Sequence, residues 1–151
     1  MKLRSTIWLI VGMLAFGCGK DKFTTVPQVS AKSISPETVF QGNIIRFVSK
    51  YTDKEGDLDS VLVVYKWYNG AAVTYVDTFR ETVRAHNLPE KATDGDIIIQ
   101  YAYNRNNTGF PDLAPKPTLR DTTATLGLVL IDKDSNRSNY TESDRIRLKK
   151  Q

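Results

Sequence analysis

Short apolar runs alternate with clusters of turn-forming residues from Lys32 to the end of the chain. Within the run 44–51, for example, Arg46 and Lys50 share one face, so Ile45, Phe47 and Tyr51 on the opposite face should point into a core. No segment keeps an apolar period of 3.6 residues over three turns, and helices are therefore expected to be minor. The side chains predicted to face the core are Ile45, Phe47, Tyr51, Val61, Val63, Tyr65, Trp67, Ile97, Ile99, Tyr101, Tyr103, Leu126, Leu128, Leu130, Ile146 and Leu148.

The turn signals divide this stretch into about seven strands, as in a small antiparallel sandwich. A short first strand is expected near 33–39, and Asn69-Gly70 is a dipeptide favoured in two-residue hairpin turns. Basic residues alternate along 145–149, which predicts an outer strand whose charges protect the edge of its sheet. The remaining strands are expected at 44–51, 60–68, 72–79, 96–103 and 123–131. We predict one β-sandwich domain over residues 32–151.

The turns carry a more specific resemblance. The run Asp53-Lys-Glu-Gly-Asp-Leu-Asp59 joins two strands, and Asp132-Lys-Asp-Ser-Asn-Arg-Ser-Asn139 precedes the last strand. This arrangement resembles the immunoglobulin-like modules of bacterial secreted proteins, namely the PKD-like, cadherin-like and fibronectin-III-like group. The resemblance implies an all-β, immunoglobulin-like antiparallel sandwich, and it implies no particular function. The chain has one cysteine, so the disulfide of true immunoglobulin cores is absent.

The two acidic turns should lie at the same end of such a sandwich, where they could bind Ca²⁺. Asp132-x-Asp134-x-Asn136 begins like an EF-hand loop, but Arg137 and Ser143 replace the required Gly and Glu. Aspartate and asparagine are also ordinary turn formers whose side chains bond the local backbone, so solvated turns are the alternative to a calcium site. The candidate ligands are Asp53, Glu55, Asp57, Asp132, Asp134 and Asn136.

Two further features bear on function. The long connection 104–120 contains three prolines, and its Phe110 and Leu113 could contact a partner, or Phe110 could cap the open end of the sandwich. The single histidine, His86, has no nucleophile or carboxylate at a recognisable spacing and is expected on the surface. Because no nucleophile-elbow, phosphate-loop or zinc-protease motif occurs either, the chain is not expected to be an enzyme.

The first eighteen residues have the layout of an export signal. Lys2 and Arg4 precede an apolar run at 7–16, which is followed by Gly17 and Cys18. The layout resembles bacterial lipoprotein precursors, whose cysteine becomes lipidated after cleavage in front of it, although Phe16 is bulkier than usual. The resemblance implies a signal peptide at 1–17 and several acyl chains on Cys18, enough for stable membrane anchoring.

The same resemblance implies a cellular location and a type of function. Gly19, rather than Asp, follows the cysteine, which favours sorting to the outer membrane. Residues 18–31 are expected to form an extended polar tether. Whether the domain faces the periplasm or the cell exterior is left open. Cleavage would reduce the net charge of +4, and the basic residues are scattered, so no nucleic-acid partner is expected. We expect a non-catalytic binding or structural module of the cell envelope with a protein or glycan partner. The alternatives are a subunit of an envelope transport or motility assembly, or a hydrolase.

Overall fold

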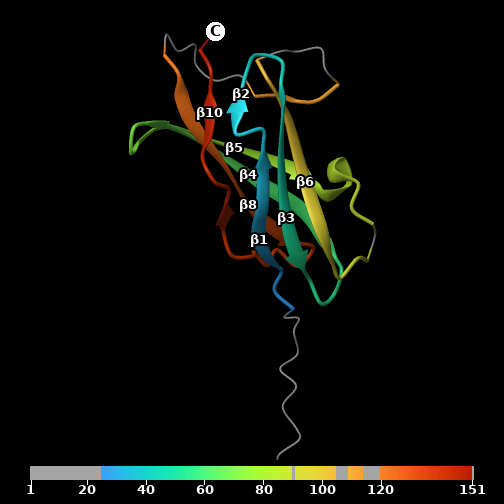
Figure 1. The fold of residues 1–151 in the computed structure, drawn as a ribbon. Helices are drawn as coiled ribbons and strands as arrows, with labels where there is room; N and C mark the ends of the chain where they lie inside the picture. Colours follow the sequence, from blue (N-terminus) through green and yellow to red (C-terminus); the bar gives the residue numbers. More distant parts are fainter. Residues whose placement is uncertain (1–24, 90, 105–108, 114–119, 151) are drawn as a thin grey trace, which may run out of the picture.

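A computed structural model describes residues 25–89, 91–104, 109–113 and 120–150 of the chain, and these residues form two sheets packed face to face (Figure 1). The first sheet has the order β1 (Gln28–Ser35), β3 (Ile44–Thr52), β6 (Asp94–Tyr103), β7 (Asp112–Leu113). The second has the order β2 (Thr38–Val39), β10 (Ile146–Leu148), β8 (Thr122–Asp132), β4 (Leu58–Asn69), β5 (Ala72–Thr82), with β9 (Thr141–Glu142) beside β8. The expected signal peptide at 1–17 and Cys18 lie outside the described residues.

The core lies between the sheets and is built from alternate residues of the long strands. Every side chain predicted to face inward is at most 4% exposed. Tyr65 and Trp67, two residues apart on β4, therefore point the same way. Their rings pack edge to face, with 5.8 Å between the ring centroids. The structure confirms both the phasing of these strands and the all-β, immunoglobulin-like sandwich.

The start of the domain differs from the prediction. The first strand begins at Gln28, inside the stretch 18–31 expected to be a tether, and pairs with β3 from Gln28–Thr52 to Ser35–Arg46. The chain then changes sheets, since β2 pairs with β10. The prediction of one strand at 33–39 is wrong, because residues 33–35 belong to β1 in the first sheet and residues 38–39 form β2 in the second.

Two local predictions also need correction. The basic last strand β10 is not the outermost strand, because β2 pairs with it in parallel and Arg147 N donates to Glu37 O at 2.7 Å. At the hairpin between β4 and β5, Asn69 pairs with Ala72, so the two loop residues are Gly70 and Ala71. The loop thus begins one residue later than the expected Asn69-Gly70, and Gly70, its first residue, adopts the left-handed conformation with φ of +60°.

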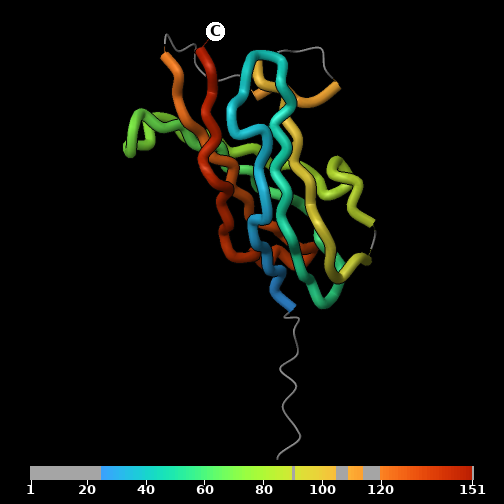
Figure 2. The backbone as a smooth tube through the Cα atoms, in the orientation of Figure 1, coloured from blue at the N-terminus to red at the C-terminus, as the bar shows by residue number. Residues whose placement is uncertain are grey.

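The chain enters the sandwich at the end that carries the acidic turns. Gln28 and Asp94 both pair with Thr52, the residue directly before Asp53. Figure 2 shows that the first described residues and the C-terminal strand end at opposite ends of the molecule. Among the described residues, one 3₁₀ turn, η1 (Val83–His86), follows β5, and no helix there is long and apolar enough to cross a membrane.

Candidate functional site

The two acidic turns meet at one end of the sandwich. Lys133 N donates to Asp57 O at 3.1 Å and joins the turn after β8 to the turn after β3. Asp53 is fully buried, and its two carboxylate oxygens accept from Glu55 N at 3.4 Å and Asp57 N at 2.9 Å. The turn after β3 is therefore organised around a buried carboxylate.

The turn after β8 is organised in the same way. Asp132 is buried, and it accepts from Asn136 N at 2.7 Å and from Asn136 Nδ2 at 2.8 Å. Asp53, Asp132 and Asn136 are thus engaged in hydrogen bonds within their own turns. The predicted set of six calcium ligands is divided, because three of its members are used to hold the turns.

The other three predicted ligands do approach one another. Oxygen atoms of Glu55, Asp57 and Asp134 lie within 4.8 Å of each other. Asp57 Oδ1 is buried and has no hydrogen-bond partner among the described residues. Burial, together with the charges of Asp53, Asp132 and Asp134, raises the pKa of the Asp57 carboxyl above its usual range. The Asp57 carboxyl therefore lies in a negatively charged environment.

His86 is not the free surface residue that was predicted. Its side chain is only 7% exposed, its Nε2 lies 2.8 Å from Glu81 Oε2, and its Nδ1 lies 3.2 Å from Ile98 O. Tyr101 donates its hydroxyl to the second oxygen of Glu81. Hydrogen bonding from His86 and Tyr101 outweighs burial and lowers the pKa of Glu81. The carboxylate was missed because it stands five residues upstream on β5, and η1 turns the chain back to bring the two side chains together.

The His86 ring lies between β5 and β6. Its Nδ1 is beside the Ile98 carbonyl on β6, and its Nε2 is beside a carboxylate oxygen of Glu81 on β5. The side chain thus links the two strands across the turn η1.

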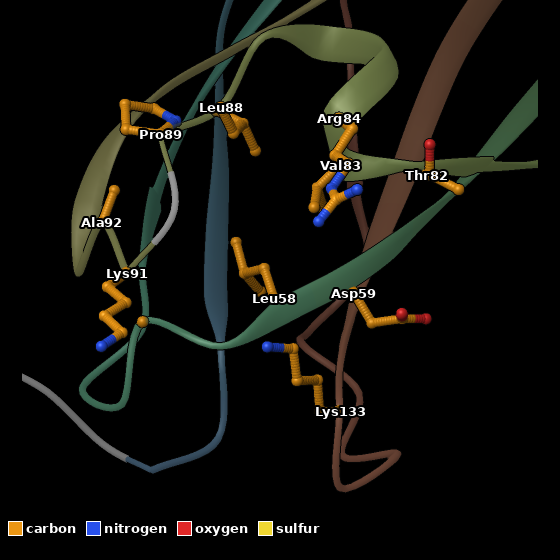
Figure 3. A pocket seen from close by; sticks show the side chains of 11 residues that line it. Leu58, Asp59, Thr82, Val83, Arg84, Leu88, Pro89, Lys91, Ala92 and Lys133 are labelled. Atoms are coloured by element: carbon orange, nitrogen blue, oxygen red, sulfur yellow. The ribbon is translucent and has the colours of Figure 1, made fainter.

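One cavity, of about 420 Å³, opens beside the acidic end (Figure 3). Leu58, Val83, Leu88 and Ala92 line it and also pack against the core, while Lys91 and Lys133 stand at its rim. These apolar side chains close the side of the sandwich where the chain crosses from β5 to β6.

A second cavity, of about 430 Å³, lies beside His86, and Phe110 lines it. Phe110 is 38% exposed and so is available to a ligand. Leu113 is 1% exposed in β7 and belongs to the core, so the expectation that it contacts a partner is wrong. The rest of the predicted binding connection, at 105–108 and 114–119, lies outside the described residues.

A polar network on the outer face of the second sheet surrounds Glu142, where β9 pairs with β8. Glu142 accepts from Lys66 Nζ at 2.7 Å and from the hydroxyls of Tyr68 and Tyr140 at 2.9 Å, and Thr125 also donates to it. Burial alone would raise the pKa of Glu142, but these hydrogen bonds lower it to about 2. Lys66 also lies 4.8 Å from the centre of the Tyr140 ring. The network fixes the segment between β8 and β10.

No family model matches the chain, and no curated protein matches its sequence. Among solved structures, it is similar to the alkylpurine DNA glycosylase AlkC of Pseudomonas fluorescens bound to DNA containing an abasic site analog, with a TM-score of 0.45, 10% identity and coverage of 83% of this chain and 31% of that one. It is also similar to the sporulation control protein Spo0M of Bacillus subtilis, with a TM-score of 0.42, 10% identity and coverage of 85% and 51%. For a Niemann-Pick type C2 protein from the Japanese carpenter ant, the TM-score is 0.41, the identity 9% and the coverage 82% and 93%.

The chain thus spans about a third and about half of the first two of these structures. At this level of identity the likenesses concern the β-sandwich alone.

Proposed function

We propose that this chain is a lipid-anchored, non-catalytic binding module of the Gram-negative outer membrane. The observation that carries the proposal is the position of the only cysteine, Cys18, directly after Gly17 at the end of the apolar run 7–16. A lone cysteine forms no internal disulfide, whereas this position is the one that lipidation requires. Anchoring is then the best account of that residue.

The fold supports an attachment of this kind. The first strand begins at Gln28, ten positions after Cys18, and a chain of that length reaches at most about 35 Å when extended. The acidic end of the sandwich is the end that would stay near the membrane, since Gln28 lies beside Thr52. The side of the sandwich with the cavity beside His86 would stay accessible to a partner.

The chemistry of the described residues supports binding rather than catalysis. The chain's single histidine lies between Glu81 and the Ile98 carbonyl, and its side chain is only 7% exposed. The carboxylates of Asp53 and Asp132 are occupied by their own turns. A sandwich with surface cavities, and with no activated base or nucleophile evident among the described residues, is suited to holding a ligand.

The test is expression of the full chain in a Gram-negative host, beside the variant Cys18→Ser. The wild-type protein should lose residues 1–17, gain the mass of a thioether-linked diacylglycerol and an amide-linked acyl chain, and enter the detergent phase on partitioning. Cys18→Ser should carry no lipid and should leave that phase. A bare thiol on Cys18, or a retained leader in the wild-type protein, would overturn the proposal.

A further inference from the structure

The cavity beside His86 has the dimensions of a small-molecule site. It opens between η1, the outer face of β6 and residues 109–111, and its volume of about 430 Å³ falls in the range of about 300–1,000 Å³ that such sites occupy. Ala85, Ile98 and Phe110 supply apolar surface, and Asn87 and Gln100 supply side-chain amides. The lining therefore combines an exposed aromatic ring and two uncharged amides with the carboxylates of Glu81 and Asp96.

The two amides are free to bind. Neither the Asn87 nor the Gln100 side chain has a hydrogen-bond partner among the described residues, and each amide offers two N–H donors and a carbonyl acceptor. Asn87 follows η1 in the left-handed conformation, with φ of 54°, and its backbone N–H is bonded to Arg84 O. Its position at the rim is thus set by the turn, while its side chain is unengaged.

The two carboxylates of the cavity are already engaged. Asp96 accepts from Lys32 Nζ at 2.7 Å, and Glu81 accepts from the Tyr101 hydroxyl and lies 2.8 Å from His86 Nε2. No lysine or arginine is among the described residues that line the cavity, so it offers no basic side chain for an anionic ligand. A ligand that matches it is neutral, carries several hydroxyl or amide groups, and has an apolar face for Phe110.

We propose that this cavity binds a neutral sugar ring, such as one unit of a surface or envelope glycan. The weakly positive C–H groups on one face of a pyranose pack against the negative face of an aromatic ring, and Phe110 offers that surface. The amides of Asn87 and Gln100 then bond hydroxyl groups as donors and acceptors. This inference rests on the proposed role as a binding module and is independent of membrane anchoring.

The test is binding of the purified full chain, in detergent, to an array of oligosaccharides. Neutral glycans built from glucose, galactose, mannose and N-acetylglucosamine are compared with sialylated, sulfated and uronate-containing ones. We expect binding to at least one neutral glycan, with an affinity that changes little between about 0.05 and about 0.5 M salt, because no net charge is involved. Retention of charged glycans alone, or of none, would overturn the inference.

Matched variants locate the site. Phe110→Ala should weaken the Kd for the neutral glycan at least about tenfold, and Gln100→Ala should weaken it several-fold. Phe40→Ala is the control, because Phe40 is also an exposed aromatic residue but lines no part of this cavity, and its Kd should equal that of the wild type. Equal losses in the Phe40 and Phe110 variants would contradict the assignment. Anchoring is read separately from the lipid on Cys18, so either proposal can fail alone.

Discussion

Asn139 pairs with Val29 in the way that a neighbouring strand would. Its Oδ1 accepts from Val29 N at 2.9 Å and its Nδ2 donates to Val29 O at 2.7 Å, although 110 positions separate the two residues. Thr141 Oγ1 accepts from Ala31 N at 2.9 Å on the same strand. The outer edge of β1 is therefore partly covered by side chains, and β1 is bonded on both sides.

Asn139→Ala should destabilise the protein by about 1–3 kcal/mol, because it leaves backbone groups of the buried Val29 without partners. Urea unfolding would measure the loss, and amide exchange at Val29 should accelerate. Asn69→Ala, in an exposed hairpin position, is the control and should leave stability unchanged. Wild-type stability in the Asn139 variant would show that these two bonds do not hold β1.

Gly127→Ala should also be destabilising, by about 1–3 kcal/mol, through overpacking. A Cβ at this position would overlap the Tyr140 hydroxyl and lie 2.6 Å from ring carbon Cζ. Tyr140 would have to leave its contacts with Lys66 and Glu142. In a Tyr140→Ala background the same glycine substitution should cost much less, and a double-mutant cycle by thermal unfolding measures the coupling. Additive effects would contradict this steric account.

Glu142 should stabilise the fold in a pH-dependent way. Its folded pKa of about 2 lies below its ordinary 4.5, so the ionised form favours folding. The contribution is complete above about pH 5 and is lost as the pH falls from 4.5 toward 2. Glu142→Gln should cost about 1–3 kcal/mol at pH 7, and the difference from the wild type should shrink as the pH approaches 2. Denaturant unfolding across this pH range measures the difference in free energy of unfolding, with the exposed Glu37→Gln as control. A difference that stays constant with pH would show that ionisation of Glu142 is not the cause.

Asp57 should act in the opposite direction. Its folded pKa is raised, so its contribution favours folding at low pH and is lost as the pH rises through the raised pKa. At neutral pH the ionised group opposes folding. Asp57→Asn should therefore increase Tm at pH 7 by about 2–4 °C, whereas the exposed Asp144→Asn should not change it. A lower Tm in the Asp57 variant would mean that its carboxylate is needed in the turn.

Calcium should have little effect on stability. Asp53, Asp132 and Asn136 are engaged in their own turns, which leaves three carboxylates against the six to eight oxygen ligands that Ca²⁺ usually takes. Millimolar Ca²⁺ should shift Tm by less than about 1 °C relative to a chelator. A larger increase, abolished by Asp134→Asn, would show that Glu55, Asp57 and Asp134 bind the ion with additional ligands.

The long strands were predictable because charged residues mark their solvent-exposed faces. Arg46, Lys50 and Lys66 alternate with apolar residues, and period two then assigns Phe47 and Trp67 to the core. Strand β1 gave no such signal, because small polar residues dominate Gln28–Ser35 and its outer partners lie far away near Asn139. Spacing along the chain contains no information about contacts of that kind.

The candidate site was likewise predictable only in part. The acidic turns were predictable as turns, and their meeting at one end followed from the fold. Whether Asp53 and Asp132 point outward to an ion or inward to the backbone depends on side-chain orientation, which composition does not determine. The Glu81–His86 pair depends on a 3₁₀ turn and a left-handed Asn87 between β5 and β6, and neither has a distinctive pattern.

The pairing of β1 with β3 also determines how the domain responds to mechanical pulling. A force applied on the N-terminal side of Gln28 acts along the axis of β1, whose partners run from Thr52 to Arg46. The hydrogen bonds between the two strands are then sheared together and do not open one after another. We therefore expect the domain to resist a pull on its N-terminal end when its opposite end is held.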